Sequence, residues 1–228
     1  MRLLRLIACC LPLLLGSCLL SPGKFDATLT VNADRSFAFA YVGDVYAIDP
    51  TKPADKPGEK ASETSATRPA SFTQDDDDDT PDPEARNRAL ALALTREPGF
   101  RRVDYLGKGK FAIDYAIKGR LDHAFLWPFN LDAEVLFPFI VIELRPDGAV
   151  RMTAPGFANQ SNRPGAEMMR DLGPSRLDGR FTLDTDAEIV SQNEESGVAR
   201  AGGRSRVTWR ATTALHQAPS AVLKLRAS

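Results

Sequence analysis

Few side chains in this sequence could carry out acid–base or metal chemistry. The chain has two histidines, His123 and His216, far apart in the sequence, so a zinc site or a His-based triad would have to use these two. Asp122 precedes His123, but neighbouring side chains of a strand point to opposite faces, so the pair cannot easily hydrogen-bond. The sequence has no Gly-x-Ser-x-Gly, Cys-x-x-Cys, phosphate-loop or Rossmann glycine pattern. We therefore expect no catalytic residue, metal or cofactor; the alternative is an enzyme that uses the carboxylates of Asp114, Asp122 and Asp132.

Aromatic residues gather in one stretch, residues 125–144, which reads FLWPFNLDAEVLFPFIVIEL. Pro128 and Pro138 interrupt any continuous strand through it. One interpretation is a buried corner of the core. Another is the lining of a pocket for an apolar ligand, and a third is a membrane-facing patch, because aromatic side chains favour membrane interfaces. The candidate residues for ligand or membrane contact are Phe125, Trp127, Phe129, Phe137 and Phe139.

The first residues have the layout of a secretory signal peptide. A short basic start is followed by an apolar run from Leu3 to Leu15, and small residues then precede Cys18. This order predicts a signal peptide over residues 1–17. An uncleaved transmembrane anchor is one alternative, since the apolar residues come close to the ~18 needed to span a bilayer, and cleavage at another position is a second. Pro12 and the small residues before Cys18 favour the signal peptide.

Leu15-Gly16-Ser17-Cys18 resembles the lipobox of bacterial lipoproteins. The resemblance implies that the sulfur of Cys18 receives diacylglycerol, that cleavage falls before it and that its new amino group is acylated. Leu19, rather than Asp, follows the cysteine, which by resemblance to lipoproteins of diderm bacteria implies the outer membrane, facing the periplasm. Cys9 and Cys10 lie in the segment predicted to be removed, so no intramolecular disulfide can form.

The net charge limits which partners the protein can bind, and the composition separates one segment, residues 50–82, from the rest of the chain. There are 29 Lys and Arg against 30 Asp and Glu, which gives no strong basic excess that would point to nucleic acid or to anionic lipid. Residues 50–82 are rich in proline and charge, with Phe72 as the only large apolar side chain, so this stretch cannot bury enough surface to fold. The adjacent aspartates at 75–79 lack the spacing of a calcium loop. We interpret residues 50–82 as a disordered Pro/Asp-rich insertion.

Alternating apolar and polar residues predict strands over most of the remaining chain. A hairpin is expected at 24–49 with its turn at Asn32–Arg35, and Gly43 indicates a bulge or a close backbone approach. Further alternation predicts hairpins over 103–117 and 140–152 and short strands near 181–183, 189, 207–209 and 223–225. Asp82-Pro83-Glu84 predicts a helix start, and a second short helix is expected at 164–172.

These elements indicate an α+β or mainly β protein, and we take α+β: mainly an antiparallel β-sheet with one or two short helices. The expected layout is a signal peptide at 1–17, a lipidated tether at 18–23, the first β-hairpin at 24–49, the insertion at 50–82 and the remainder of a single domain at 83–228.

Several motifs together resemble a family of uncharacterised proteobacterial lipoproteins. They are CLLSPGKFDATLTVNADRSFAFAYVGDV, GRLDHAF, APGF, TDAEIVSQN and a later VTW, and their arrangement is also similar, more loosely, to the LppM-like lipoprotein domain. The resemblance carries no catalytic residues. LppM-like proteins often end with an apolar membrane segment, whereas residues 225–228 here read LRAS, so we expect attachment through Cys18 alone. The expected function is a non-enzymatic envelope lipoprotein, held near the membrane by lipidated Cys18, that binds an amphiphile such as a lipid or acyl chain, or an envelope protein partner.

Overall fold

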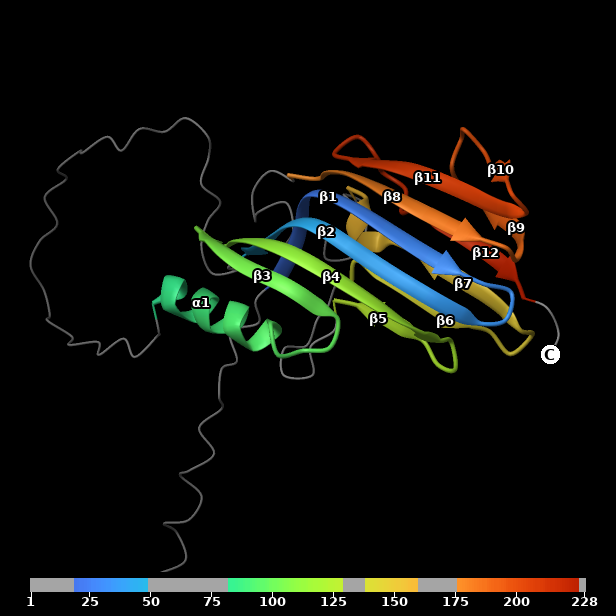
Figure 1. Ribbon diagram of the computed structural model, residues 1–228. Coiled ribbons are helices and arrows are strands. Elements are labelled where there is room, and N and C mark those ends of the chain that lie inside the picture. The colour runs from blue at the N-terminus through green and yellow to red at the C-terminus, as the bar shows by residue number, and fades with distance from the viewer. Residues whose placement is uncertain (1–18, 49–81, 129–137, 160–175, 226–228) are drawn as a thin grey trace, which may run out of the picture.

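The computed structural model describes residues 19–48, 82–128, 138–159 and 176–225, which form two β-sheets (Figure 1). The larger sheet has seven strands in the order β10-β11-β8-β1-β2-β4-β3, and the smaller has five in the order β5-β6-β7-β12-β9. The larger sheet contains β1 (Leu19–Val31), β2 (Ser36–Ile48), β3 (Phe100–Gly107), β4 (Lys110–Arg120), β8 (Asp178–Thr185), β10 (Ala199–Ala201) and β11 (Arg204–Thr212). The smaller contains β5 (Phe125–Trp127), β6 (Ile140–Leu144), β7 (Ala149–Thr153), β9 (Glu188–Gln192) and β12 (Ser220–Lys224).

The expected α+β class is wrong, because the part of the chain that the structure describes is mainly β. It contains a single α-helix, α1 (Pro83–Leu94), and one 3-10 turn, η1 (Pro155–Phe157). Alternation identifies strands but does not show which sheet each strand joins, so the expected single antiparallel sheet is in fact two sheets, and β1 pairs with β8 in parallel. The expected helix at 164–172, the signal peptide, Cys18 and residues 50–81 of the insertion lie outside the described residues.

β1 and β2 form the long hairpin that alternation predicts. In its turn, Asn32 N donates to Ser36 O (2.8 Å), and Asp34 Oδ1 accepts from the backbone N–H and the hydroxyl of Ser36 (2.9 and 2.6 Å). The hairpin is longer than expected, because β1 begins at Leu19, paired with Ile48. Residues that we expected to form a tether are therefore part of the strand.

A β-bulge near the start of β1 explains this difference. The register against β2 shifts between Pro22 and Phe25, and Phe25 faces Gly43. A Cβ on Gly43 would lie 2.4 Å from Lys24 O and 2.5 Å from Phe25 Cα, so only glycine fits there. The close backbone approach predicted at Gly43 is confirmed. Because the bulge breaks the period of two, alternation alone detects the strand only after it.

Helix α1 begins as its sequence predicts and packs on the edge strand β3. The side chain of Asp82 caps it by accepting from Glu84 N (3.1 Å), and Pro83 occupies the first turn. Asn87 Nδ2 donates to the hydroxyl of Tyr105 on β3 (3.3 Å), and Glu84 Oε1 accepts from Lys108 N in the β3–β4 turn (3.0 Å). The helix therefore holds the β3–β4 turn from beside the sheet.

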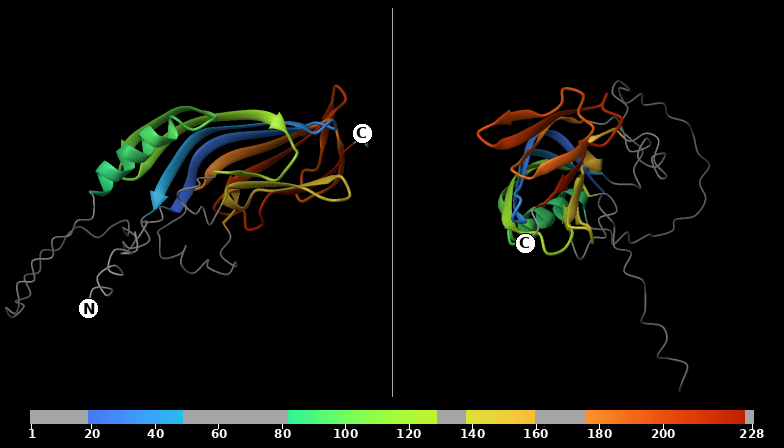
Figure 2. Two further views of the ribbon diagram at one scale, coloured as in Figure 1. Left: turned by 90° about the horizontal axis from the view of Figure 1, so that it is seen from below. Right: turned by 90° about the vertical axis from the view of Figure 1, so that its right-hand side faces the viewer.

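The larger sheet curves over the smaller one, and their facing side chains form one hydrophobic core (Figure 2). Helix α1, the start of β1 and the end of β2 lie at one end of the molecule, while the β1–β2 and β6–β7 turns lie at the other (Figures 1 and 2). Across the four described ranges, none of the helical segments has the length and hydrophobicity to cross a membrane.

Candidate functional site

The described members of the predicted contact set lie in the interior between the two sheets. Phe125 and Trp127 belong to β5, and Phe139 directly precedes β6. Trp127 is 3% exposed and Phe139 1%, whereas Phe125 is half-buried. Phe129 and Phe137 lie outside the described residues. Side chains placed like Trp127 and Phe139 face the inside of the domain rather than a membrane surface.

Aromatic rings from both sheets surround Trp127. Its ring centroid lies 4.7 Å from that of Tyr41 and 5.2 Å from that of Phe39, both on β2. It lies 5.1 Å from the ring of Tyr115 on β4 and 5.4 Å, edge to face, from that of Phe139. Such pairs contribute about 0.5–1.5 kcal/mol each beyond the area they bury. These five residues are the Trp127 cluster.

Phe157 connects the Trp127 cluster to a second group of rings. Its ring stacks on Phe25 at 4.4 Å and lies 5.3 Å from Phe181 on β8. Phe181 in turn stacks on Trp209 of β11 at 5.5 Å. The aromatic interior thus runs from β5 to β11.

The Trp127 cluster contains a buried polar atom that the described residues leave unpaired. The indole Nε1 of Trp127 is buried, and no acceptor among them reaches it. The hydroxyl of Tyr41, by contrast, donates to Asp44 O at 2.8 Å. Burial raises the pKa of Tyr41 well above its usual value and that of Tyr115 to about 12, so both phenols are neutral. The cluster therefore presents a neutral apolar surface with an unpaired donor.

Trp209, the second tryptophan, has the partner that Trp127 lacks. Its Nε1 donates to Asn193 Oδ1 at 3.0 Å, and the same oxygen accepts from Ser220 N at 2.9 Å. Asn193 Nδ2 donates to Ala218 O at 2.8 Å. Asn193 therefore joins the segment after β9 to β11 and to the chain before β12. This contact joins the last residue of the motif TDAEIVSQN to the tryptophan of VTW, and its role is structural.

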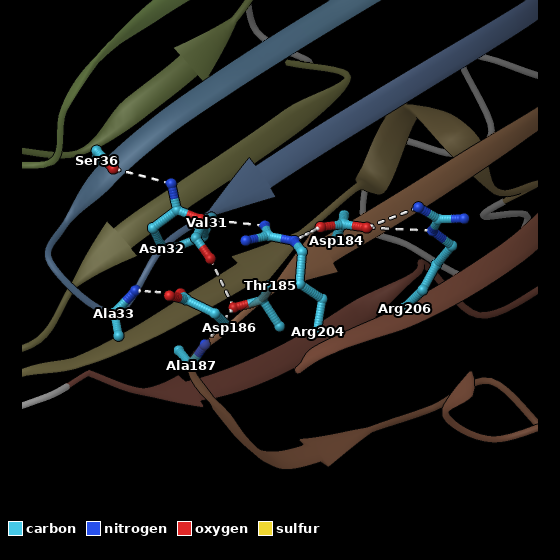
Figure 3. A network of polar contacts seen from close by, with 10 residues as sticks. All are labelled: Val31, Asn32, Ala33, Ser36, Asp184, Thr185, Asp186, Ala187, Arg204 and Arg206. Atoms are coloured by element: carbon cyan, nitrogen blue, oxygen red, sulfur yellow. Dashed lines mark hydrogen bonds and ion pairs between the residues drawn. The ribbon is translucent and has the colours of Figure 1, made fainter. Parts of the chain in front are cut away.

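A polar network ties the β1–β2 turn to strands β8 and β11 (Figure 3). Arg204 Nε donates to Asp184 Oδ1, and Arg206 Nη2 donates to Asp184 Oδ2 at 2.9 Å. Arg204 Nη2 also donates to Asn32 Oδ1 at 3.1 Å. Burial raises the pKa of Asp184, but the hydrogen bonds and charges of the two arginines outweigh it, so this pKa lies below its usual value.

The same network continues through the turn that joins β8 to β9. Thr185 Oγ1 donates to Val31 O at 2.6 Å and accepts from Ala187 N at 3.0 Å. Asp186 Oδ1 accepts from Ala33 N at 2.7 Å. These polar groups are satisfied within the fold, so we interpret the network as a structural link between the two turns.

The two carboxylates of the enzyme hypothesis that the structure describes, Asp114 and Asp122, each lie beside an arginine. Asp114 lies on β4 and pairs with Arg101 (Nη2 to Oδ1, 2.6 Å). Asp122 follows β4 and lies 3.6 Å from Arg120 Nε, while Asp132 is outside the described residues. Both histidines are exposed, and within the described ranges no group of three or more His, Cys, Asp and Glu side chains could hold a metal ion.

The sequence alone identifies most of these residues but does not show that they contact one another. Phe39, Tyr41 and Tyr115 follow the alternation of their strands, so their inward direction could be predicted. Nothing in the pattern indicates that they meet Trp127, because β5 is only 3 residues long and gives no alternation of its own. The unpaired Nε1 could be recognised only once the packing was known.

The comparisons with known proteins add a distant likeness. No protein-family model matches the chain, and no curated protein matches it. The chain is similar to the NMR structure of the folded domain of Mycobacterium tuberculosis LppM, with 14% identity over 91% of this chain and 93% of that one, at a TM-score of 0.32. It is also similar to an M1 zinc metallopeptidase from Deinococcus radiodurans, with 12% identity over 92% of this chain but only 43% of the peptidase, at a TM-score of 0.31. Likenesses at this level carry no conclusion about function.

Proposed function

We propose that the protein is a non-enzymatic envelope lipoprotein, attached through lipidated Cys18 to the outer membrane on its periplasmic side, whose domain binds an amphiphile at the Trp127 cluster. The observation that supports binding is the unpaired Nε1 of Trp127 inside an aromatic interior. A core role alone accounts for the burial of the rings but not for a buried donor without an acceptor. Leaving such a group unpaired costs about 1–3 kcal/mol, which a bound acceptor removes.

The surroundings of Trp127 favour a neutral acceptor on an apolar ligand. Phe39, Tyr41, Tyr115 and Phe139 carry no charge at neutral pH, because burial raises the pKa of both phenols. An ionised carboxylate buried among them without a cation would be strongly destabilised. An ester or amide carbonyl can accept from Nε1 without that penalty, and an acyl chain matches the rings. The ligand class is therefore an esterified or amide-linked acyl chain rather than a free fatty acid.

Fluorescence quenching tests this proposal, because the chain has two tryptophans that serve as each other's control. The protein from residue 18 onward, carrying Cys18→Ser, is prepared with Trp209→Phe so that Trp127 is the only emitter. A dibrominated fatty-acid methyl ester should quench this protein at tens of micromolar. The matched variant Trp127→Phe, which emits from Trp209 alone, should be quenched much less. The free brominated acid should quench Trp127 only at higher concentration.

Two results would count against amphiphile binding. Absence of quenching of Trp127 would refute amphiphile binding, and binding of a protein partner would become the preferred function. Equal quenching of both tryptophans would indicate non-specific association of the ester with the protein.

A further inference from the structure

Three segments meet at the end of the larger sheet where β1 begins. Leu20 of β1 pairs with Ala47 of β2, and Ala47 N donates to Gly109 O in the β3–β4 turn at 2.8 Å. Gly109 therefore lies two strand spacings from Leu20, about 10 Å. Cys18 directly precedes Leu19 in the sequence.

Tyr46 lies on this end of the sheet with two cations beside its ring. Lys110 Nζ lies 5.9 Å from the ring centroid, and the guanidinium carbon of Arg176 lies 4.5 Å from it. The ring covers Gly23, where a Cβ would come within 2.5 Å of Tyr46 Cε2. Lys110 also pairs with Asp44 at 3.0 Å. A tyrosine and two basic groups thus lie at the end of the sheet where β1 begins, and Cys18 is the residue before β1 in the sequence.

The β3–β4 turn adds an exposed apolar and an exposed basic residue to the same end. Leu106 is 56% exposed, and Lys108 is exposed at the tip of the turn. Lys108 has a positive φ of 53° between Gly107 and Gly109, so the chain reverses sharply there. Glu84 also lies here, but its carboxylate accepts from Lys108 N at 3.0 Å.

We propose that this end of the larger sheet, formed by Tyr46, Leu106, Lys108, Lys110 and Arg176 and here called the anchor-end surface, rests on the phospholipid headgroups. The proposal rests on the lipidation of Cys18 in the function proposed above. The acyl chains are attached to Cys18, and the next residue, Leu19, is already part of β1. No free linker therefore separates this surface from the membrane. Tyrosine with Lys and Arg is the composition that membrane interfaces favour, and the long basic side chains reach phosphate oxygens while their stems cover apolar surface.

The opposite end of the molecule gives the control. β1 has 13 residues, which span about 40 Å, so the β1–β2 turn lies far from the anchor. The β6–β7 turn, which contains the exposed Arg145, lies at that same far end (Figure 1). If the anchor-end surface rests on the headgroups, a probe at Lys108 lies at the bilayer surface and a probe at Arg145 lies in water.

Site-specific labelling of the full lipidated protein tests this arrangement. Cys18 is the sole cysteine after residue 17, and acylation blocks its sulfur, so Lys108→Cys and Arg145→Cys each introduce one free thiol for an environment-sensitive fluorophore. The proteins are reconstituted in phosphatidylethanolamine–phosphatidylglycerol vesicles that contain a lipid with a quencher attached to its headgroup. We expect several-fold stronger quenching, and bluer emission, for the label at Lys108.

Equal quenching at both positions, or stronger quenching at Arg145, would overturn the anchor-end surface. That result would leave the proposed function intact, provided that the protein stays on the vesicles after a high-pH wash. Loss of the protein from the vesicles in that wash would instead refute the lipid anchor itself. The two failures are therefore distinguishable in one preparation.

Discussion

Trp127 and Trp209 differ in one hydrogen bond, and this difference predicts opposite responses to the same substitution. Trp209→Phe removes the bond to Asn193 and some buried volume, so the free energy of unfolding should fall by about 2–3 kcal/mol. Trp127→Phe also loses volume but removes an unpaired buried donor, so the two effects should cancel to within about 1 kcal/mol. Urea denaturation of both variants measures the two changes. A loss for Trp127→Phe as large as that for Trp209→Phe would show that Nε1 has a partner in solution.

Asp184 predicts how the stability of the domain depends on pH. Its side chain is 13% exposed and bonds to two arginines, so Asp184→Asn should lower the free energy of unfolding by about 2 kcal/mol at neutral pH. The folded-state pKa is lowered, so the stabilisation is fully present above the unfolded value of about 4 and is lost as the pH falls through the folded pKa. The difference between wild type and variant should therefore shrink in acid.

Asp178→Asn is the matched control for this measurement. Asp178 pairs with Arg210, but their side chains are 52% and 69% exposed, and exposed pairs contribute at most about 1 kcal/mol. A loss for Asp178→Asn that equals the loss for Asp184→Asn would contradict the special role of the buried carboxylate.

Individual residues were predictable where the chemistry is local. Asp82 as a helix cap and Gly43 as a close approach depend on near neighbours in the sequence or on the backbone alone, and both are found. Asn193 with Trp209 and Asp184 with Arg204 are long-range pairs. Their residue types show that a partner is needed but not which partner it is, because that depends on the order of strands in the sheet.

The bulge in β1 predicts unequal effects of alanine at two glycines. Gly43→Ala would place a methyl group 2.4 Å from a backbone oxygen, which neither strand can move to avoid, so the free energy of unfolding should fall by about 3 kcal/mol. Gly107→Ala meets no atom within 4 Å and bears only the strain of its positive φ of 86°, about 1–2 kcal/mol. Denaturation midpoints at constant slope give both values. A smaller loss at Gly43 than at Gly107 would contradict the close contact.

Strands were easier to predict than the sheets they form. Each long strand carries its own period of two, and the hairpins β1–β2, β3–β4 and β6–β7 join neighbours in sequence. The short strands β5, β9 and β12 assemble a second sheet through pairs that no local pattern records. Sheet membership is therefore decided by burial of the whole core, and the expected single sheet with helices was wrong for this reason.

We expect the domain to tolerate deletion of most of the segment between β2 and α1. β2 ends at Ile48 and α1 begins at Pro83. Replacing residues 52–80 by a short Gly-Ser loop should shift the melting temperature by only a few degrees, because the entropy of loop closure changes slowly with length. A melting temperature lowered by more than about ten degrees, equivalent to well over 1 kcal/mol, would show that the segment packs on the domain.

Membrane attachment predicts the behaviour of the whole molecule in fractionation. Cys18→Ser, combined with replacement of residues 1–17 by a signal peptide that is cleaved without lipidation, should release the protein from membranes, because each buried methylene of an acyl chain contributes about 0.8 kcal/mol and two or three chains hold it firmly. The domain itself should remain folded in the soluble fraction. Retention of this variant with the membrane after a high-pH wash would contradict the lipid anchor.

The place of β1 in the larger sheet has a consequence for how the chain folds as it emerges, N-terminus first. β1 comes first among the described strands, yet it lies between β2 and β8, and β8 starts only at Asp178. A chain that leaves the ribosome or a translocon N-terminus first therefore has one edge of β1 open until β8 follows. A lone hairpin is only marginally stable, so the hairpin of β1 and β2 does not form a stable folded unit before β8 follows. The open edge is meanwhile a template for pairing with other chains, so the chain is most prone to aggregation during that interval.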